Sequence, residues 1–94
     1  MIGNAVSFMT RLGEQLTEQL NKVMKQVRSL DNYQINWSAV HDVMRDLRRE
    51  FQKLRRMVSK AHTLATSSDH RRTLRELAEH LDRKIDYCRR WQGD

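Results

Sequence analysis

Apolar side chains recur at intervals of three and four residues along most of the chain, and this spacing constrains the fold more than any other feature. The pattern is strictest from Trp37 to Ala65, where the two intervals alternate over four heptads. Such spacing places the apolar side chains on one stripe of an α-helix. Proline is absent and glycine occurs three times, so residues that interrupt helices are scarce. The sequence therefore predicts an all-α protein.

Two polar breaks divide this pattern into three segments. Asp31 and Asn32 favour a turn because their side chains bond to nearby backbone, and residues 66–69 form the second break. We predict helices over residues 4–30, 37–66 and 69–92, within a single domain spanning residues 1–94. Short connections between long helices favour an antiparallel, up-down-up three-helix bundle. A second arrangement stays open, in which the first two helices form a hairpin that dimerises into a four-helix core, with the third helix outside.

Each segment carries an apolar stripe that should form the core. In the first segment Gly13 falls off the stripe, which consists of Ala5, Met9, Leu12, Leu16, Leu20, Val23, Val27 and Leu30. The third stripe consists of Leu74, Leu77, Leu81, Ile85 and Cys88. We expect Asn36 or Ser38 to cap the second helix, and Ser68 or Asp69 to cap the third. The second helix has an additional apolar row, formed by Val43, Met57 and Leu64, and a stripe this wide suits contact with two neighbours.

The up-down-up topology predicts which residues meet at each end of the bundle. The first connection and the end of the third helix should lie together, which gathers four aromatic residues, Tyr33, Trp37, Tyr87 and Trp91. Aromatic rings at such a position either close the end of a bundle or provide a binding surface. At the opposite end, His62 and His70 should flank the second connection, beside Arg71 and Arg72.

The middle segment, residues 37–68, carries four of the six net positive charges of the chain. Its basic residues are Arg45, Arg48, Arg49, Lys53, Arg55, Arg56 and Lys60. Four of them (Arg48, Arg55, Arg56 and Lys60) have no acidic residue three or four positions away, so they need acids from another helix, water or a partner. Phosphates of nucleic acid are one such partner and an acidic protein is another. The third interpretation is a solvated face with a few interhelical bridges, for example from Lys60 to Glu76.

The chain lacks the motifs that enzymes and metal sites need. It has no glycine-rich phosphate loop and no nucleophile elbow, so we expect no catalysis, no cofactor and no small-molecule substrate. The four histidines, His41, His62, His70 and His80, lie far apart, whereas zinc needs about four converging ligands. Cys88 is the single cysteine, which excludes an internal disulfide and suits a reducing compartment. Because no apolar run is long enough to span a membrane, we expect a cytoplasmic protein without a membrane partner.

One short stretch has a family likeness. Residues 61–68 read Ala-His-Thr-Leu-Ala-Thr-Ser-Ser and resemble the phospho-accepting segment of histidine phosphotransfer domains, which are also small helical bundles. That family usually reads Ala-His-x-Leu-Lys-Gly-Ser, so the resemblance implies that His62 accepts a phosphoryl group. Ala65 and Thr66 stand where the family has the lysine that helps hold the phosphoryl group and the glycine that lets the partner approach.

These observations predict a non-catalytic helical module for protein–protein interaction. Its partner is another protein or a second copy, bound through Val43, Met57 and Leu64 or through the four aromatic residues. The alternative is a bundle that binds nucleic acid through the basic face of the second helix. Phosphotransfer at His62 is the remote third function.

Overall fold

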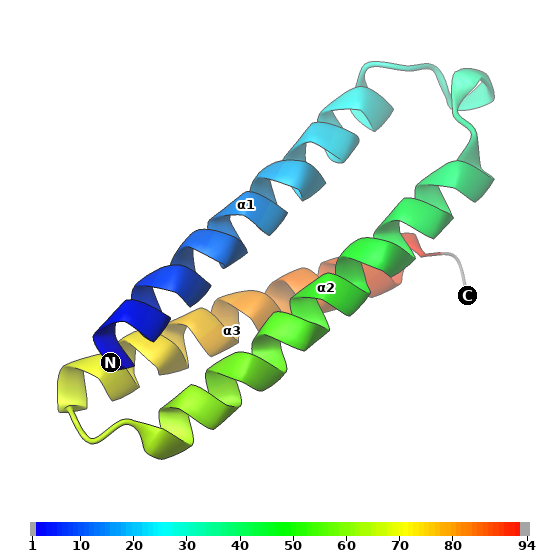
Figure 1. Cartoon of the computed structure of the whole chain (residues 1–94). Coiled ribbons are helices and arrows are strands. Elements are labelled where there is room, and N and C mark those ends of the chain that lie inside the picture. The colour runs from blue at the N-terminus through cyan, green and yellow to red at the C-terminus, as the bar shows by residue number, and fades with distance from the viewer. Residues whose placement is uncertain (1, 93–94) are drawn as a thin grey trace.

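Residues 2–92 are described by a computed structural model and form three α-helices in an antiparallel, up-down-up bundle, as predicted (Figure 1). The helices are α1 (Ile2–Arg28), α2 (Trp37–Leu64) and α3 (Ser68–Trp91), and a short 3-10 helix, η1 (Asn32–Gln34), connects α1 to α2. The bundle is a rod with extents of 52 × 23 × 16 Å. Within residues 2–92, no helix is long and apolar enough to cross a membrane. The predicted domain also includes Met1, Gly93 and Asp94, which lie outside the described residues.

The helix boundaries lie within two residues of the predicted ones. Asn36 caps α2 as expected, because its Oδ1 accepts a hydrogen bond from the Ala39 amide at 3.1 Å. The prediction for α3 is wrong by one position: Ser67 is the cap, and its Oγ accepts from the His70 amide at 3.4 Å. The backbone of Ser67 is extended, with φ −75° and ψ 133°, so the helical conformation already begins at Ser68.

The core runs along the whole rod and is centred on α2. Eight side chains are almost completely buried: Leu20, Met44, Phe51, Leu54, Val58, Leu74, Leu81 and Cys88. The stripes predicted for α2 and α3 supply most of them, and α2 makes its most extensive contacts with α3. Burying these side chains is the main favourable contribution to stability, at about 1.5–3 kcal/mol for each large apolar side chain.

The predicted stripe of α1 is partly wrong. Ala5 is exposed, whereas Val6 and Met24 are buried, and Gly13 is buried rather than placed off the stripe. The reason is that α1 packs against both α2 and α3, so its buried face is turned towards α3 relative to the simple stripe. A Cβ atom at Gly13 would lie 3.4 Å from Leu77 Cδ1 and 3.6 Å from Leu54 Cδ2. Gly13 therefore marks the point where α1 meets both neighbours.

Candidate interaction surfaces

The two sides of α2 differ in chemistry, because one borders α1 and the other borders α3. Val43, Met57 and Leu64 recur at multiples of one heptad and lie on the α1 side. Arg48, Arg55 and His62 recur at the same spacing and lie on the α3 side. Two seams therefore run along the rod, an apolar seam between α1 and α2 and a basic seam between α2 and α3.

The apolar seam keeps large side chains exposed, as the second apolar row predicted. Leu64 is 74% exposed, and Val43 and Met57 are nearly 40% exposed. Residues of α1 extend this surface: Phe8 is 56% exposed and Leu30 is 44% exposed. The placement of Leu30 in the core is thus wrong, because α1 ends at Arg28, before this residue. Phe8 was missed, although an aromatic residue outside the apolar stripe of α1 was a readable signal.

The two ends of the apolar seam have different shapes. Near η1, a groove of about 240 Å³ lies between α1 and α2. Its apolar lining comprises Val23, Val27, Leu30, Ile35, Ala39, Val40 and Val43. At the opposite end Phe8 of α1 and Met57 and Leu64 of α2 are exposed, and these three side chains are called the ridge below. Phe8 shares the face of the groove residue Gln26, because about 3.6 residues per turn place them five full turns apart.

The aromatic residues near η1 gather only in part. Trp37 and Trp91 stack with ring centroids 5.9 Å apart and an interplanar angle of 8°, and Tyr87 lies 6.4 Å from Trp91. Trp37 Nε1 also donates a hydrogen bond to Asn32 Oδ1 at 3.1 Å. Tyr33 contradicts the prediction: it is 84% exposed on η1 and has no ring contact among the described residues. The three gathered rings close the end of the bundle and tie the start of α2 to the end of α3.

The basic seam is anchored by an interhelical ion pair. Arg55 Nε donates to Asp82 Oδ1 of α3 at 3.0 Å, so the acid that α2 itself does not provide comes from its neighbour. This pair marks the register in which α2 and α3 pack. One heptad further along α2, His62 lies opposite Arg75, and both side chains line the same groove. One heptad back, the register places Arg48 opposite Arg89. Among residues 2–92, the ion pair that joins α2 to α3 is the one between Arg55 and Asp82.

Two residues of the predicted basic face of α2 pair with acids on the same helix. Lys53 pairs with Glu50 at 3.8 Å, and Glu50 occupies the heptad row of Val43 and Met57 on the α1 side. Arg45 pairs with Asp42 at 3.0 Å, an acid three residues before it. Arg49, Arg56 and Lys60 are exposed and make no ion pair with a described residue, so the expected bridge from Lys60 to Glu76 is not found there. Buried Arg48 Nε lacks a hydrogen-bond partner among the same residues.

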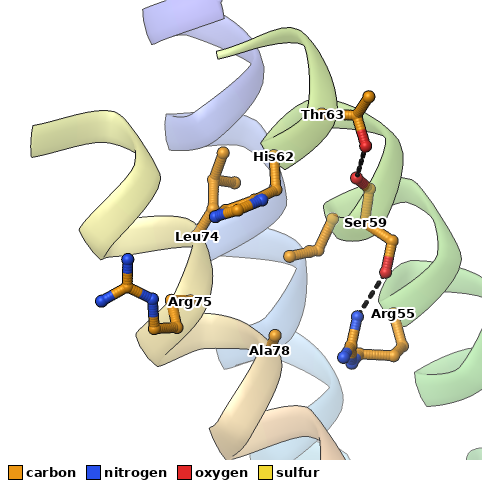
Figure 2. A pocket seen from close by; sticks show the side chains of 8 residues that line it. Arg55, Ser59, His62, Thr63, Leu74, Arg75 and Ala78 are labelled. Atoms are coloured by element: carbon orange, nitrogen blue, oxygen red, sulfur yellow. Dashed lines mark hydrogen bonds between the residues drawn. The ribbon is translucent and has the colours of Figure 1, made fainter. Parts of the chain in front are cut away.

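Within α3, two ion pairs form across three residues. Arg72 pairs with Asp69 at 3.2 Å, and Arg89 pairs with Asp86 at 3.7 Å. Arg75 makes no ion pair with any residue between 2 and 92. Arg75 lines a groove together with residues of α2, and its exposed guanidinium points away from Arg55 and His62 (Figure 2).

A groove of about 360 Å³ opens in this seam between the second half of α2 and the first half of α3 (Figure 2). The α2 wall consists of Arg55, Val58, Ser59, His62 and Thr63, and the α3 wall of Leu74, Arg75 and Ala78. Figure 2 shows Arg55 bonded to the Ser59 hydroxyl, and Thr63 Oγ1 donates to the Ser59 carbonyl oxygen at 3.1 Å. His62 is half-buried in this groove, and its role as a phosphoryl acceptor stays a prediction.

The other titratable side chains are placed for packing. Burial raises the pKa of the Cys88 thiol to about 11, despite the opposing positive charges of Lys84 and Arg48. The thiol is therefore protonated at neutral pH and packs as a small apolar group. His80 Nε2 lies 3.3 Å from Thr17 Oγ1 and joins α3 to α1. Among the described residues, no group of three or more His, Cys, Asp or Glu side chains is arranged to hold a metal ion.

Comparisons with protein-family models, with curated proteins and with solved structures found no match to this chain.

Proposed function

We propose that the protein is a non-catalytic helical interaction module that pairs with a second copy of itself through the apolar seam between α1 and α2. The observation that carries this proposal is the distribution of exposed large apolar side chains within residues 2–92. Apart from Tyr33 on η1, they are Phe8, Leu30, Val43, Met57 and Leu64, which all border this seam. Contiguous exposed apolar surface on a small protein is typical of a binding site.

The shape of the seam supports a second copy as the occupant. The ridge of Phe8, Met57 and Leu64 lies at one end and the groove beside Val43 lies at the other. A two-fold axis across the rod places the ridge of each copy over the groove of the other, which is the self-complementary contact of a symmetric dimer. In this dimer, α1 and α2 of both copies form a shared four-helix layer, and α3 lies on the outside of each copy.

The charge distribution is also compatible with this pairing. The net charge of +6 opposes association of two copies. However, Arg48 and Arg55 lie on the opposite side of α2, and the α1 side carries the ion pair between Lys53 and Glu50. The surfaces that meet in the dimer therefore avoid the basic seam.

The test measures mass by light scattering after size exclusion, for the parent and for a Val43→Glu/Met57→Glu variant. We expect the parent to be a dimer that persists in high salt, because burial of apolar area drives it. The variant should be a monomer with unchanged helicity by circular dichroism. A Ser7→Glu/Thr73→Glu variant adds the same charge on exposed positions beside the seam of α1 and α3, and it should remain dimeric.

A parent protein that is monomeric at every concentration tested contradicts the proposal, as does a dimer that both double variants retain. A milder variant, Phe8→Ser/Leu64→Ser, guards against a misfolded first variant. Both of its side chains are more than half exposed, so the fold should tolerate the change while the dimer weakens.

A second candidate function is binding of nucleic acid along the basic seam. It is favoured by Arg49, Arg56 and Arg75, which make no ion pair with a described residue. Arg49 and Arg56 are the residues to reverse, because both are exposed and have no ion-pair partner among the described residues. Reversal of Arg55 would instead break its pair with Asp82. Under this function, the Arg49→Glu/Arg56→Glu variant loses binding to a mixed RNA and DNA pool and keeps its oligomeric state.

A further inference from the structure

The groove between α2 and α3 carries a second, separate inference. We propose that it binds an oxyanion, a phosphate group held non-covalently between Arg55 on one wall and Arg75 on the other. The inference does not depend on self-association, because none of the eight groove residues belongs to the exposed apolar set of the other seam.

The polar lining of the groove offers several donors. Arg55 and Arg75 contribute guanidinium groups, His62 an imidazole and Ser59 a hydroxyl group, whereas the Thr63 hydroxyl already donates its proton to the Ser59 carbonyl oxygen. Of the described residues that line it, none is acidic. Guanidinium groups bind phosphate through paired, charge-assisted hydrogen bonds, which are stronger than bonds between neutral groups. The chemistry of the wall therefore selects an anion with several acceptor oxygens.

The α2 wall is held in place before any ligand arrives. Arg55 is fixed at two points, with Nε on Asp82 Oδ1 and Nη1 on Ser59 Oγ. Ser59 uses its oxygen as an acceptor in this contact, so its own O–H is free to donate into the groove. Thr63 is tied to the Ser59 carbonyl one turn away. A donor set that is already ordered loses less conformational entropy on binding than a set of mobile side chains.

On the α3 wall, Arg75 carries a positive charge that the ion pair between Arg55 and Asp82 does not neutralise. Asp82 neutralises Arg55, but it lies one heptad from the layer that holds Arg75 and His62. Arg75 has no ion-pair partner among the described residues, and its exposed side chain turns into the groove when an anion binds. An anion in the groove supplies the missing negative charge to this layer. The apolar floor of Val58, Leu74 and Ala78 lowers the local dielectric and strengthens that attraction.

The experiment titrates the isotope-labelled protein with inorganic phosphate at constant ionic strength and follows amide and arginine Nε resonances. We expect saturable shifts centred on Ser59, His62 and Arg75. Arg75→Gln should weaken phosphate binding about tenfold, because one charge-assisted contact pair is lost. Arg75→Lys keeps the charge and loses the paired geometry, so its phosphate affinity should lie between those of the parent and Arg75→Gln.

Arg72→Gln is the matched control on the same helix. It removes the same charge, but Arg72 pairs with Asp69 and is not among the groove residues, so phosphate affinity should be unchanged. Equal losses in Arg72→Gln and Arg75→Gln overturn the proposal, because they indicate a general electrostatic effect. Shifts that do not saturate, or that spread over all arginines, overturn it as well.

A second arm distinguishes the two sources of the phosphate group. A short single-stranded oligonucleotide is added in place of inorganic phosphate, to the parent and to Arg75→Gln. If both ligands shift the resonances of the groove residues and Arg75→Gln weakens the binding of both, the groove binds a backbone phosphate of a polynucleotide. If inorganic phosphate alone binds there, the ligand is a small phosphate compound. Oligonucleotide binding that bypasses the groove, without phosphate binding, contradicts the inference and leaves the proposed self-association untouched.

Discussion

Gly13 lies at the place where all three helices meet. Its position is buried on α1, and an added Cβ would meet Leu77 and Leu54 at ordinary van der Waals distances. The site therefore has room for a methyl group but not for a larger side chain. Thr17 Oγ1 donates to the Gly13 carbonyl oxygen at 2.9 Å, one turn later, and also lies near His80, so this part of α1 is bonded to α3.

Gly13→Ala should stabilise the protein by about 0.5–1 kcal/mol, because alanine has the higher helix propensity and restricts the unfolded chain. Gly13→Val should destabilise it, since its branched side chain must displace Leu77 or Leu54. Chemical denaturation of the two variants measures both effects. A lower free energy of unfolding for Gly13→Ala would contradict this expectation, because it would mean that the added methyl group clashes with Leu77 or Leu54.

His80 makes stability depend on pH. Its pKa is lowered from the usual 6.5, first by burial and then by the positive charges of Lys84 and Arg83. Because the folded state binds the proton less readily than the unfolded state, stability is full above pH 6.5 and falls as pH drops towards the folded pKa. Thermal unfolding should therefore occur at lower temperature at acidic pH, and His80→Gln should make this dependence shallower. Identical pH dependence in parent and variant would refute the assignment to His80.

At the scale of elements, two kinds of contact hold the end of the bundle near η1. Asn36 caps α2 through the Ala39 amide, and the stacked pair of Trp37 and Trp91 joins the start of α2 to the end of α3. Arg90 lies over the Tyr87 ring, 5.7 Å from its centroid, and extends this cluster. The contacts are important because the groove beside Val43 lies between α1 and α2 at this end of the bundle.

Trp91→Ala should destabilise the protein by about 2 kcal/mol, because it removes the stack with Trp37 and the contact with Tyr87. Hydrogen exchange should become faster at the start of α2 and the end of α3, and much less so near the second connection. Tyr33→Ala is the matched control at the same end of the rod. Its ring is exposed and unstacked, so stability should change by no more than about 0.5 kcal/mol. Equal effects of the two variants would show that the stack contributes nothing.

For the whole molecule, α2 separates two surfaces of opposite character. It buries its central stripe between α1 and α3, and the residues beside that stripe are apolar towards α1 and basic towards α3. A rod of 52 × 23 × 16 Å has a large surface for its volume, so both seams remain accessible along its length. The proposed dimer covers only the seam between α1 and α2. The basic seam and its groove then face outward on each copy.

Much of this architecture follows from sequence alone, because local spacing and polar breaks are properties of the chain. The intervals of three and four residues determine three helices, the breaks at Asp31 and Ser67 determine where they end, and short connections determine that they are antiparallel. The exposure of Val43, Met57 and Leu64 also follows, since a stripe wider than one neighbour can cover leaves an uncovered edge.

Only the tertiary structure decides how the helices turn against each other and which charges meet. The rotation of α1 buries Gly13 and exposes Ala5, and the register of α2 on α3 pairs Arg55 with Asp82 and places His62 opposite Arg75. Periodicity cannot supply these facts, because it orders residues within one helix and contains no information about rotation or register between two. Those depend on how side chains of different helices pack together, and this packing exists only once the bundle has formed.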